Sequence, residues 1–578
     1  MTVIGKVASP PRRESTSELF YFWISPETLI EKTQIVRTQC TIGEQPVTFY
    51  GLVTEVYRQS RQADMAEEVD RYDGDVTYKP PFDSAGFTFA EVAILRTVPA
   101  VLCPPREGSD VVLGEAADAQ MAYGADEIEN RLAVGVVKNG GSHRAGPGFI
   151  DLDYLLGANG GHLNVNGVAG RGTKSSFLLH VNYLLLRDAR KQAKERPGDP
   201  HRLRVVPIIL NVKNFDLFHI DRRSKRFEPG KHLPTWEQLG VPDPAPFTGV
   251  GYFAPQMKGL AIPVDTGRPV ADVKPYSWSL KDVIEAGLFT YLFAEEDVYD
   301  ANFGALVMDL ENHLTDERDV AGKRVRSLRP GKAQTFDELL DDLKPDSQGA
   351  DVSSLPGHSP QTVKKLYRRL LRLLLEGGDG VLRRSEQAGN PLKVVRHDTC
   401  DPIVIDLSSL AGLPQLQRFV VATIFRQLEE SRRGSSVQKG LHYLVTLDEL
   451  NRFAPRNSHD PITELIERVA AEMRSQGILL FGAQQQGSLV SIRVIENAGL
   501  RVLGKSGSLE LDQPVWRFLS DAARKKAVTL LPDEKLLVQD SFREPMLVTI
   551  PMPPWALRGL DAMTELTTSG EFNEFDNA

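Results

Sequence analysis

The sequence predicts an α/β protein that begins with a small β-barrel and carries a mainly helical insertion within its α/β core. The first 112 residues contain short alternating runs of polar and apolar residues between turn-forming residues, as in small barrels. From about Ile150 onward, compact apolar runs alternate with long helical patterns, which is typical of a parallel sheet covered by helices. A chain of 578 residues exceeds what one hydrophobic core supports, so several domains are expected.

The predicted strands of the N-terminal region are short and lie close together in the sequence. They are Leu19–Ile24, Thr33–Thr38, Val47–Glu55, Phe87–Leu95 and Val111–Leu113. Turn-forming residues such as Gly43, Gly51 and Asp73-Gly74 separate them. This pattern favours a small barrel over residues 1–112, and an irregular α+β cap is the alternative.

Six later runs are rich in Val, Ile and Leu, as buried parallel strands are. They are His162–Asn166, Val205–Val212, Ile403–Leu407, Tyr443–Leu447, Ile478–Ala483 and Arg501–Gly504. We expect residues 113–214 and 401–555 to form the two parts of the α/β core. The predicted insertion, residues 215–400, has a Pro/Gly-rich stretch followed by helices at Leu280–Phe293, Asn302–Leu314 and Thr362–Leu375.

Composition and charge restrict the compartment and the class of partner. Lys plus Arg number 68 and Asp plus Glu 77, giving a net charge of −9, so any nucleic-acid contact must come from a local basic stripe. Three widely spaced cysteines argue against a disulfide framework or a zinc site. With no signal peptide and no apolar run near the ~20 residues of a membrane span, we expect a cytoplasmic protein without membrane contact. Residues 556–578 form an acidic tail, predicted to be mobile or to contact a partner.

The strongest motif is HLNVNGVAGRGTKSSFLLHV, residues 162–181, which predicts a strand, a glycine-rich loop and a helix. Gly167, Gly170 and Gly172 allow backbone N–H groups to turn inward around phosphate oxygens, and the helix N-terminus adds partial positive charge. Lys174 can then reach the β and γ phosphates, with Ser175 as a Mg²⁺ ligand and Ser176 beside it.

The loop departs from the usual spacing GxxxxGK[ST], because Thr173 stands between the last glycine and the lysine. Which backbone amides take which phosphate oxygens is therefore open. The alternative is a glycine-rich turn with a surface lysine. The strand before the loop, and the helix and paired serines after it, favour nucleotide binding.

A second motif is HYLVTLDELNRF, residues 442–453, in which an apolar run leads directly into Asp448-Glu449. Two acids at the end of a buried strand are costly unless a cation is present. Asp448 is predicted to hold Mg²⁺ through water, and Glu449 to polarise the attacking water. A solvated acidic turn is the alternative, which the glycine-rich loop on the same sheet makes less favourable.

A third stretch, residues 467–490, predicts a helix, a break at Gly477, a buried strand and then Gln484, Gln485 and Gln486. A glutamine there can hold the attacking water or sense the γ phosphate, or it can belong to an ordinary polar loop. Arg474, just before the strand, can act on a neighbouring subunit's nucleotide or satisfy helix-end carbonyls.

Two basic segments are less specific, the amphipathic helix of residues 364–378 and the loop of residues 323–332. Either can contact DNA phosphates, and solvated faces or subunit contacts are equally open. The sequence has no HExxH and no GxSxG motif, so nothing favours a zinc or serine hydrolase.

The order of these motifs resembles the HerA branch of the HerA/FtsK superfamily of hexameric DNA-translocating ATPases. The resemblance rests on the barrel, on GVAGRGTKSS, LDELNRF and EMRSQGILLFGAQQQ, and on DSFREPMLVTIPMPPWA near the end. It covers residues 1–215 and 400–555. It implies a RecA-like P-loop ATPase core and a barrel similar in form to that of ATP synthase subunits.

The resemblance also implies roles for single residues. Lys174 and Ser175 would bind phosphate and Mg²⁺, Asp448 and Glu449 would be the Walker B acids, and Gln484 would be the sensor. Arg474 would act in trans, because EMRSQGI resembles the family's EGRKxGI. Some relatives have an arginine before the histidine of the Walker A strand, where this chain has Gly161, so a second trans arginine must come from elsewhere.

The function implied is an ATP- and Mg²⁺-dependent homo-hexamer that moves double-stranded DNA through its central channel. A partner nuclease or other effector would dock at the barrel, in antiphage defence or DNA end processing, with defence favoured. One alternative is a ring scaffold whose nucleotide state controls a partner effector with little translocation. Another is a secretion or conjugation ATPase, against which the absent membrane span and the N-terminal barrel count.

Overall fold

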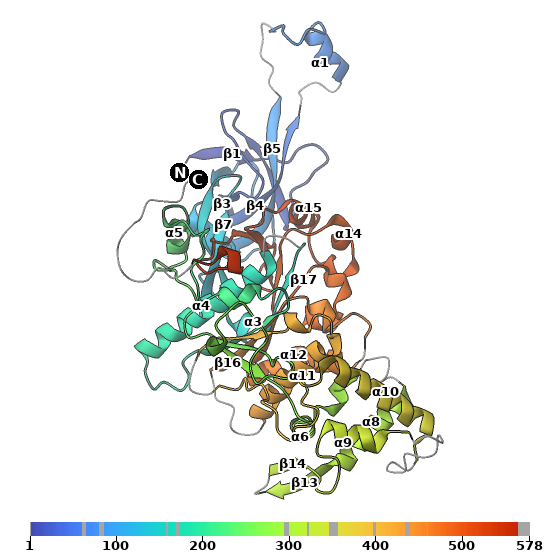
Figure 1. Cartoon of the computed structure of the whole chain (residues 1–578). Coiled ribbons are helices and arrows are strands. Elements are labelled where there is room, and N and C mark those ends of the chain that lie inside the picture. Colours follow the sequence, from blue (N-terminus) through green and yellow to red (C-terminus); the bar gives the residue numbers. More distant parts are fainter. Residues whose placement is uncertain are drawn as a thin grey trace, which may run out of the picture. The chain divides into compact units, whose positions relative to one another are not determined.

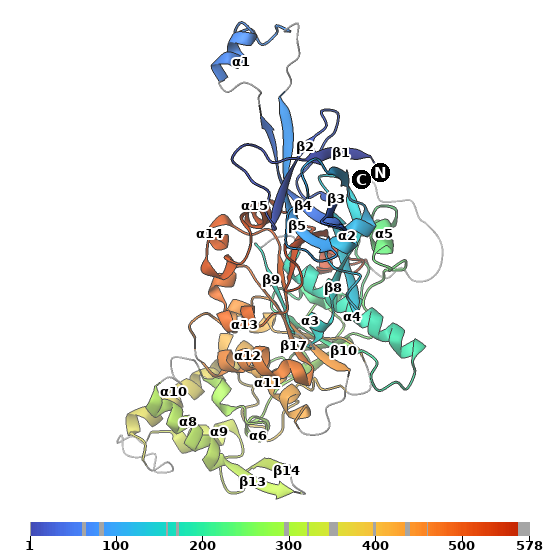
Figure 2. The same ribbon diagram turned by 180° about the vertical axis from the view of Figure 1, so that it is seen from behind.

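The computed structural model describes residues 2–59, 65–79, 86–157, 160–168, 173–293, 300–320, 323–345, 357–396, 400–433, 440–458 and 460–563 (Figures 1 and 2). The chain forms two compact units. Unit 1 is Met1–Leu152, Pro234–Pro242 and Arg501–Pro551, and unit 2 is Asp153–Leu233, Asp243–Leu500 and Met552–Ala578. The predicted domain boundaries differ, because residues 113–152 and 501–551 group with the barrel and not with the second unit.

Unit 1 contains the predicted barrel, which is closed in the order β1-β2-β5-β4-β3-β6. Its strands are β1 (Val3–Val7), β2 (Leu19–Ile24), β3 (Ile35–Ile42), β4 (Gln45–Gln59), β5 (Phe87–Val98) and β6 (Asp110–Leu113). Alternate residues of these strands point inward, so Phe20, Phe22, Phe49 and Val92 are fully buried in one apolar core. Helix α1 (Met65–Arg71), between β4 and β5, was not predicted.

The rest of unit 1 is an antiparallel sheet with short helices. Strands β19 (Glu534–Gln539), β20 (Met546–Thr549), β7 (Arg131–Lys138) and β8 (Arg144–Asp151) pair in that order. The helices are α2 (Ala116–Ala122), α14 (Ser508–Leu511) and α15 (Asp521–Thr529). Trp516 and Leu536 belong to a second apolar cluster of this unit.

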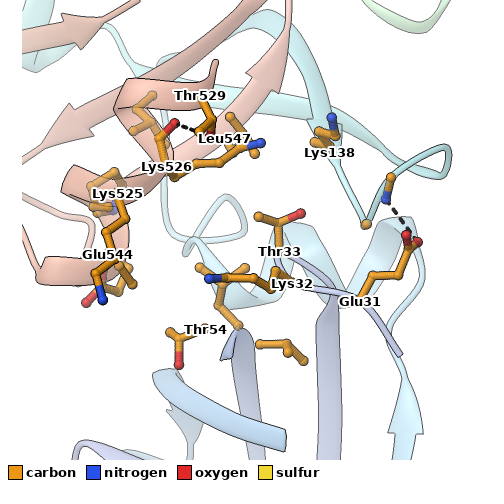
Figure 3. Close-up of a pocket in the computed structure, with 18 residues that line it drawn as sticks. Glu31, Lys32, Thr33, Thr54, Lys138, Lys525, Lys526, Thr529, Glu544 and Leu547 are labelled. Atoms are coloured by element: carbon orange, nitrogen blue, oxygen red, sulfur yellow. Dashed lines mark hydrogen bonds between the residues drawn. The ribbon is translucent and has the colours of Figure 1, made fainter. Parts of the chain in front are cut away.

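Unit 1 also has an open pocket of about 450 Å³. Its lining includes Lys32 from the barrel, Lys138 at the end of β7, and Lys525 and Lys526 from α15 (Figure 3). Glu31 accepts a hydrogen bond from the N–H of Gly141 at its rim (3.0 Å). The Lys138 ammonium is itself buried and forms an ion pair with the buried carboxylate of Glu534.

Unit 2 is built on a parallel sheet with the strand order β12-β11-β15-β10-β16-β17-β9. The strands are β9 (Leu163–Asn166), β10 (Arg204–Asn211), β11 (Gly251–Pro255), β12 (Val273–Tyr276), β15 (Ile403–Asp406), β16 (Leu441–Leu447) and β17 (Ile478–Gln484). Almost every residue of β9, β10, β16 and β17 is buried, which explains their nearly continuous apolar sequences. These strands confirm the predicted core runs and the predicted α/β class. Strand β18 (Leu500–Leu503) spans the boundary of the units.

Helices precede or follow the strands of unit 2 outside the predicted insertion. They are α3 (Asp153–Leu156), α4 (Thr173–Glu195), α11 (Pro414–Ser431), α12 (Pro461–Glu472) and α13 (Ile492–Glu496). Helix α4 packs on β9, β10 and β17, and α12 packs on β17 and α11. Each of α11 and α12 has proline at its first position, where the missing N–H costs no helical hydrogen bond.

The predicted insertion is only partly helical. It contains α6 (Leu280–Glu285), α8 (Ala301–Leu314), α9 (Phe336–Leu343) and α10 (Pro360–Gly377), and α5 (Pro229–Gln238) spans the unit boundary. In both views α8, α9 and α10 cluster beside the hairpin of β13 (Thr315–Val320) and β14 (Lys323–Leu328) (Figures 1 and 2).

Besides its helices, the predicted insertion contributes β11 and β12, two strands that were not predicted and that extend the parallel sheet beyond β15. Their sequences, GYFAP and VKPY, are short and contain glycine, proline and lysine, so no apolar run marks them. The predicted basic loop of residues 323–332 was wrong in part, since it begins with strand β14.

Cys40, Cys103 and Cys400 are free thiols. Among the described residues, no helix has both the length and the apolarity that a membrane span requires.

Candidate functional site

The glycine-rich loop connects β9 to α4. Its first glycine, Gly167, donates its backbone N–H to the carbonyl of Gln484 at the end of the neighbouring strand (3.2 Å). Residues 169–172 lie outside the described residues, so Gly170 and Gly172 are predicted phosphate-binding residues without a described position. Helix α4 begins at Thr173, which places the extra residue of the motif on the first helical turn rather than in the loop.

Helix α4 brings the first motif to the second. Lys174, at the start of the helix, is 6% exposed, and Ser175 follows it. The Ser175 hydroxyl donates a hydrogen bond to Oδ2 of Asp448 (2.7 Å), although 273 residues separate the two in sequence. Ser176 is half-buried on the same turn. The sheet therefore assembles the lysine, the serine and the first acid at one edge.

Ammonium and carboxylate groups lie together at this end of the sheet, which suits the binding of both an anion and a cation. Burial lowers the pKa of Lys174, and the nearby Lys213 ammonium lowers it further, whereas Asp448 and Glu449 raise it. A buried ammonium that lacks full solvation gains strongly from a phosphate ligand.

Glu449 is held tightly at the end of β16. Its backbone is left-handed (φ 58°), and its N–H donates to Oδ1 of Asp448 (2.9 Å). Burial acts to raise the pKa of its carboxyl, but an ion pair with Lys213, a hydrogen bond from Gln485 (3.0 Å) and the charge of Arg452 outweigh burial and lower that pKa. Glu449 is therefore an ionised carboxylate, as a base that polarises water must be.

The glutamines at the end of β17 lie in two different environments. Gln484, the predicted sensor, is fully buried, and its amide pairs with Asn164 of β9 through two hydrogen bonds of 2.7 and 3.2 Å. Gln485, which was not assigned that role, reaches Glu449. The geometry thus brings Gln485, another of the three candidate glutamines, to Glu449, whereas Gln484 pairs with Asn164 within the sheet.

Arg474 lies at the opposite end of β17 from the glutamines. It belongs to the short 3-10 helix Met473–Gln476 and is exposed. Its backbone and Cβ pack against Gly157 and Gly161, which precede β9. Strand β17, seven residues long and ending at Gln484, lies between them, a length of about 20 Å. Arg474 therefore does not reach the phosphate edge of its own subunit.

The residues present fit a magnesium ion. Among the described residues no group of three or more His, Cys, Asp or Glu side chains could hold a metal ion. Mg²⁺ needs no such group, because it retains several waters and takes one or two protein oxygens plus substrate phosphates. The Ser175 hydroxyl and the Asp448 carboxylate supply those oxygens.

Lys213 is the contributor that sequence reasoning missed, and Gln485 was only one of three candidate glutamines. Each stands just beyond the end of a buried strand, β10 and β17, which is the available sequence signal. Only the order of strands in the sheet reveals that both reach Glu449.

Comparisons with known proteins give similarity of fold. No protein-family model and no curated protein match the chain. It is similar to VirB4 of Thermoanaerobacter pseudethanolicus, with 17% identity and a TM-score of 0.41 over 74% of this chain and 97% of that chain. It is also similar to the bacterial conjugative coupling protein TrwB, with 11% identity and a TM-score of 0.43 over 78% and 96%.

The genome packaging NTPase B204 from Sulfolobus turreted icosahedral virus 2 matches with 14% identity and a TM-score of 0.21 over 27% of this chain and 69% of that chain. At these levels of identity the likeness is one of fold alone.

Proposed function

We propose that this chain is a Mg²⁺-dependent ATP hydrolase. The observation that carries the proposal is the hydrogen bond between Ser175 and Asp448, beside the buried Lys174 and Glu449. A phosphate lysine, a hydroxyl ligand, a metal-binding acid and a second acid for water are the parts that P-loop nucleotide hydrolysis uses.

Each residue has a distinct role in this proposal. The N–H groups at the start of α4 and the Lys174 ammonium bind the β and γ phosphates, and Ser175 and Asp448 hold Mg²⁺. The ion, when bound, neutralises the charge that develops on the phosphate oxygens. Glu449 orients the water and accepts its proton. Gln485 fixes the carboxylate, and Arg474 serves the nucleotide of a neighbouring subunit.

Two substitutions test the hydrolase. We expect Lys174→Ala to lose ATP binding, because the lysine supplies the main charge toward the phosphates. Glu449→Gln should bind ATP and hydrolyse it at least about 100-fold more slowly, because general-base catalysis contributes roughly 10²–10⁴-fold. Binding is measured by calorimetry and turnover by phosphate release. Wild-type turnover in the Lys174→Ala protein would contradict the proposal.

We further propose that the hydrolase works as a homo-hexameric ring that moves double-stranded DNA through its channel. An exposed Arg474 remote from its own nucleotide edge supports a site completed by a neighbour. A partner nuclease or other effector would dock at the barrel, in antiphage defence or DNA end processing in the cytoplasm.

The mass of the purified particle with and without ATP and duplex DNA tests the ring, and a monomer under all conditions contradicts it. Duplex DNA should stimulate turnover. Preferential stimulation by single-stranded DNA would instead favour a conjugation-type ATPase. A ring whose turnover ignores all DNA would be a nucleotide-controlled scaffold for its partner.

A further inference from the structure

Lys213 forms an ion pair with Glu449, the proposed water-activating acid, at the end of the sheet where the γ phosphate is expected to bind. Strands β10 and β16 are parallel neighbours, with Leu210 opposite Leu447, so Lys213 and Glu449 leave the sheet at almost the same level. The Lys213 ammonium contacts Oε1 of Glu449, and the Gln485 amide donates to the same oxygen (3.0 Å).

The two side chains of this ion pair differ in how freely they can move. The Glu449 side chain is 9% exposed, and its backbone is fixed by a left-handed turn and by the hydrogen bond to Asp448. The Lys213 side chain is 42% exposed, on a flexible four-carbon stem. If the pair opens, the lysine moves and the carboxylate remains.

A second ammonium lies close by. The charge of Lys213 acts on Lys174, so both ammonium groups and both acids share the edge where the γ phosphate is expected. Arg452 approaches the other oxygen of Glu449 (3.6 Å), and it continues to balance that carboxylate when Lys213 moves. A γ phosphate carries more negative charge than one carboxylate and therefore competes for Lys213.

We propose that Lys213 is a γ-phosphate-responsive counter-ion of Glu449, an inference that rests on the proposed ATP hydrolysis. ATP draws the Lys213 ammonium from Glu449 to the γ phosphate, whereas ADP leaves the ion pair closed. Glu449, still held by Gln485, is then free to accept a proton from water. The water oxygen bonds to the γ phosphorus, the bond to the bridging oxygen breaks with its electron pair leaving on ADP, and the proton passes from Glu449 to solvent.

The alternative is an ion pair that only stabilises the fold. A structural role would lower the melting temperature but would not distinguish ATP from ADP. The decisive quantity is therefore the ratio of the affinities for a non-hydrolysable ATP analogue and for ADP, measured by calorimetry with Mg²⁺ on the full chain.

Lys213→Met should lower this affinity ratio about tenfold or more, a change of roughly 1.4 kcal/mol or more, with ADP affinity nearly unchanged. It should also lower kcat more than it changes KM for ATP, and Lys213→Arg should restore part of both. Lys281→Met is the matched control, since it removes an exposed Lys–Glu pair on α6 and should leave the ratio unchanged.

An unchanged affinity ratio in Lys213→Met, or equal losses for both nucleotides, overturns the inference. If Lys213→Met does not fold, Lys213→Gln and Lys213→Arg are compared by the same ratio. Failure here differs from failure of the proposed function. A wild-type protein that binds no ATP would contradict the proposed ATP hydrolase function. ATP turnover that requires Lys174 but not Lys213 would contradict only this inference.

Discussion

Single residues at the C-terminal edge of the unit 2 sheet show how buried charge is tolerated there. Asp448 accepts hydrogen bonds from Ser175 and from a backbone N–H, and Glu449 has an ion pair, an amide donor and a second cation. Each carboxylate is therefore compensated on both oxygens, as buried charges must be.

His162 gives unit 2 a stability that depends on pH. Burial lowers its pKa to about 4, with the charge of Arg474 contributing, and its Nδ1 accepts a hydrogen bond from the N–H of Leu480 (2.9 Å). The unfolded pKa is about 6.5, so the unfolded chain binds the proton more readily. The stabilisation is fully present above about pH 6.5 and is lost as the pH falls toward 4.

Between about pH 7 and about pH 4.5 we expect the free energy of unfolding of the wild type to fall by roughly 2–3 kcal/mol more than that of His162→Gln. Urea denaturation at both pH values measures the difference. If the free energy of unfolding falls equally with pH in the two proteins, His162 does not cause this pH dependence.

Substitutions of the two glutamines at the end of β17 should affect different properties, Gln484 the stability of the fold and Gln485 the rate of turnover. Gln484→Ala leaves the buried amide of Asn164 without its partner, which costs about 1–3 kcal/mol of stability. Gln485→Ala loses a half-exposed contact to Glu449, so it should lower kcat with little change in melting temperature. Phosphate release per folded molecule and thermal melting test both. Unimpaired turnover in Gln485→Ala combined with loss in Gln484→Ala would restore Gln484 as the sensor.

Helix α10 has an apolar face and a basic face. Leu366, Leu370 and Leu373 are buried, while Lys364 and Arg368 are exposed one turn apart. The apolar residues fix the helix on unit 2, which leaves the cations available for phosphates.

Charge reversal on α10 tests DNA contact. We expect Lys364→Glu/Arg368→Glu to weaken duplex binding and to reduce the salt dependence of log K by roughly 2, because each lost phosphate contact removes about 0.9 from the slope. Fluorescence anisotropy over a salt series measures this change. Lys191→Glu/Lys194→Glu on α4 has the same net charge and is the control. Equal binding curves for the two variants would make α10 a solvated or subunit-contacting face.

At the scale of the whole molecule, the position of Arg474 allows an experiment that distinguishes a ring from subunits that act independently. Its own β17 spans about 20 Å between it and the phosphate edge. Lys174→Ala and Arg474→Ala should each be inactive alone. A mixture should regain turnover, because an Arg474→Ala subunit offers an intact nucleotide edge and a Lys174→Ala neighbour offers an intact arginine.

Turnover of the two variants is compared before and after subunit mixing. No gain on mixing, together with full activity of Arg474→Ala, would remove the trans role. A double variant carrying both changes is the control, because its presence in a mixture adds no complete site.

Sequence reasoning predicted the elements with strong periodicity. Strand β2 has the predicted bounds, and β9, β16 and β17 differ from prediction by one or two residues at an end. It failed for β11 and β12 and for the β13–β14 hairpin. In these segments Pro, Gly and charged residues hide the strand pattern, and strand pairing with a neighbour, rather than local preference, defines the strand.

The sequence by itself determined the chemistry available to this protein: Lys174 and Ser175 after a glycine-rich loop, and Asp448-Glu449 after a buried strand. Those identities depend on local patterns that a linear chain displays. Only the tertiary structure decided which side chains meet, because contacts between parallel strands depend on sheet order and not on sequence distance. It joined Ser175 to Asp448, gave Glu449 to Lys213 and Gln485, turned Gln484 into the core and placed Arg474 at the far end of its strand.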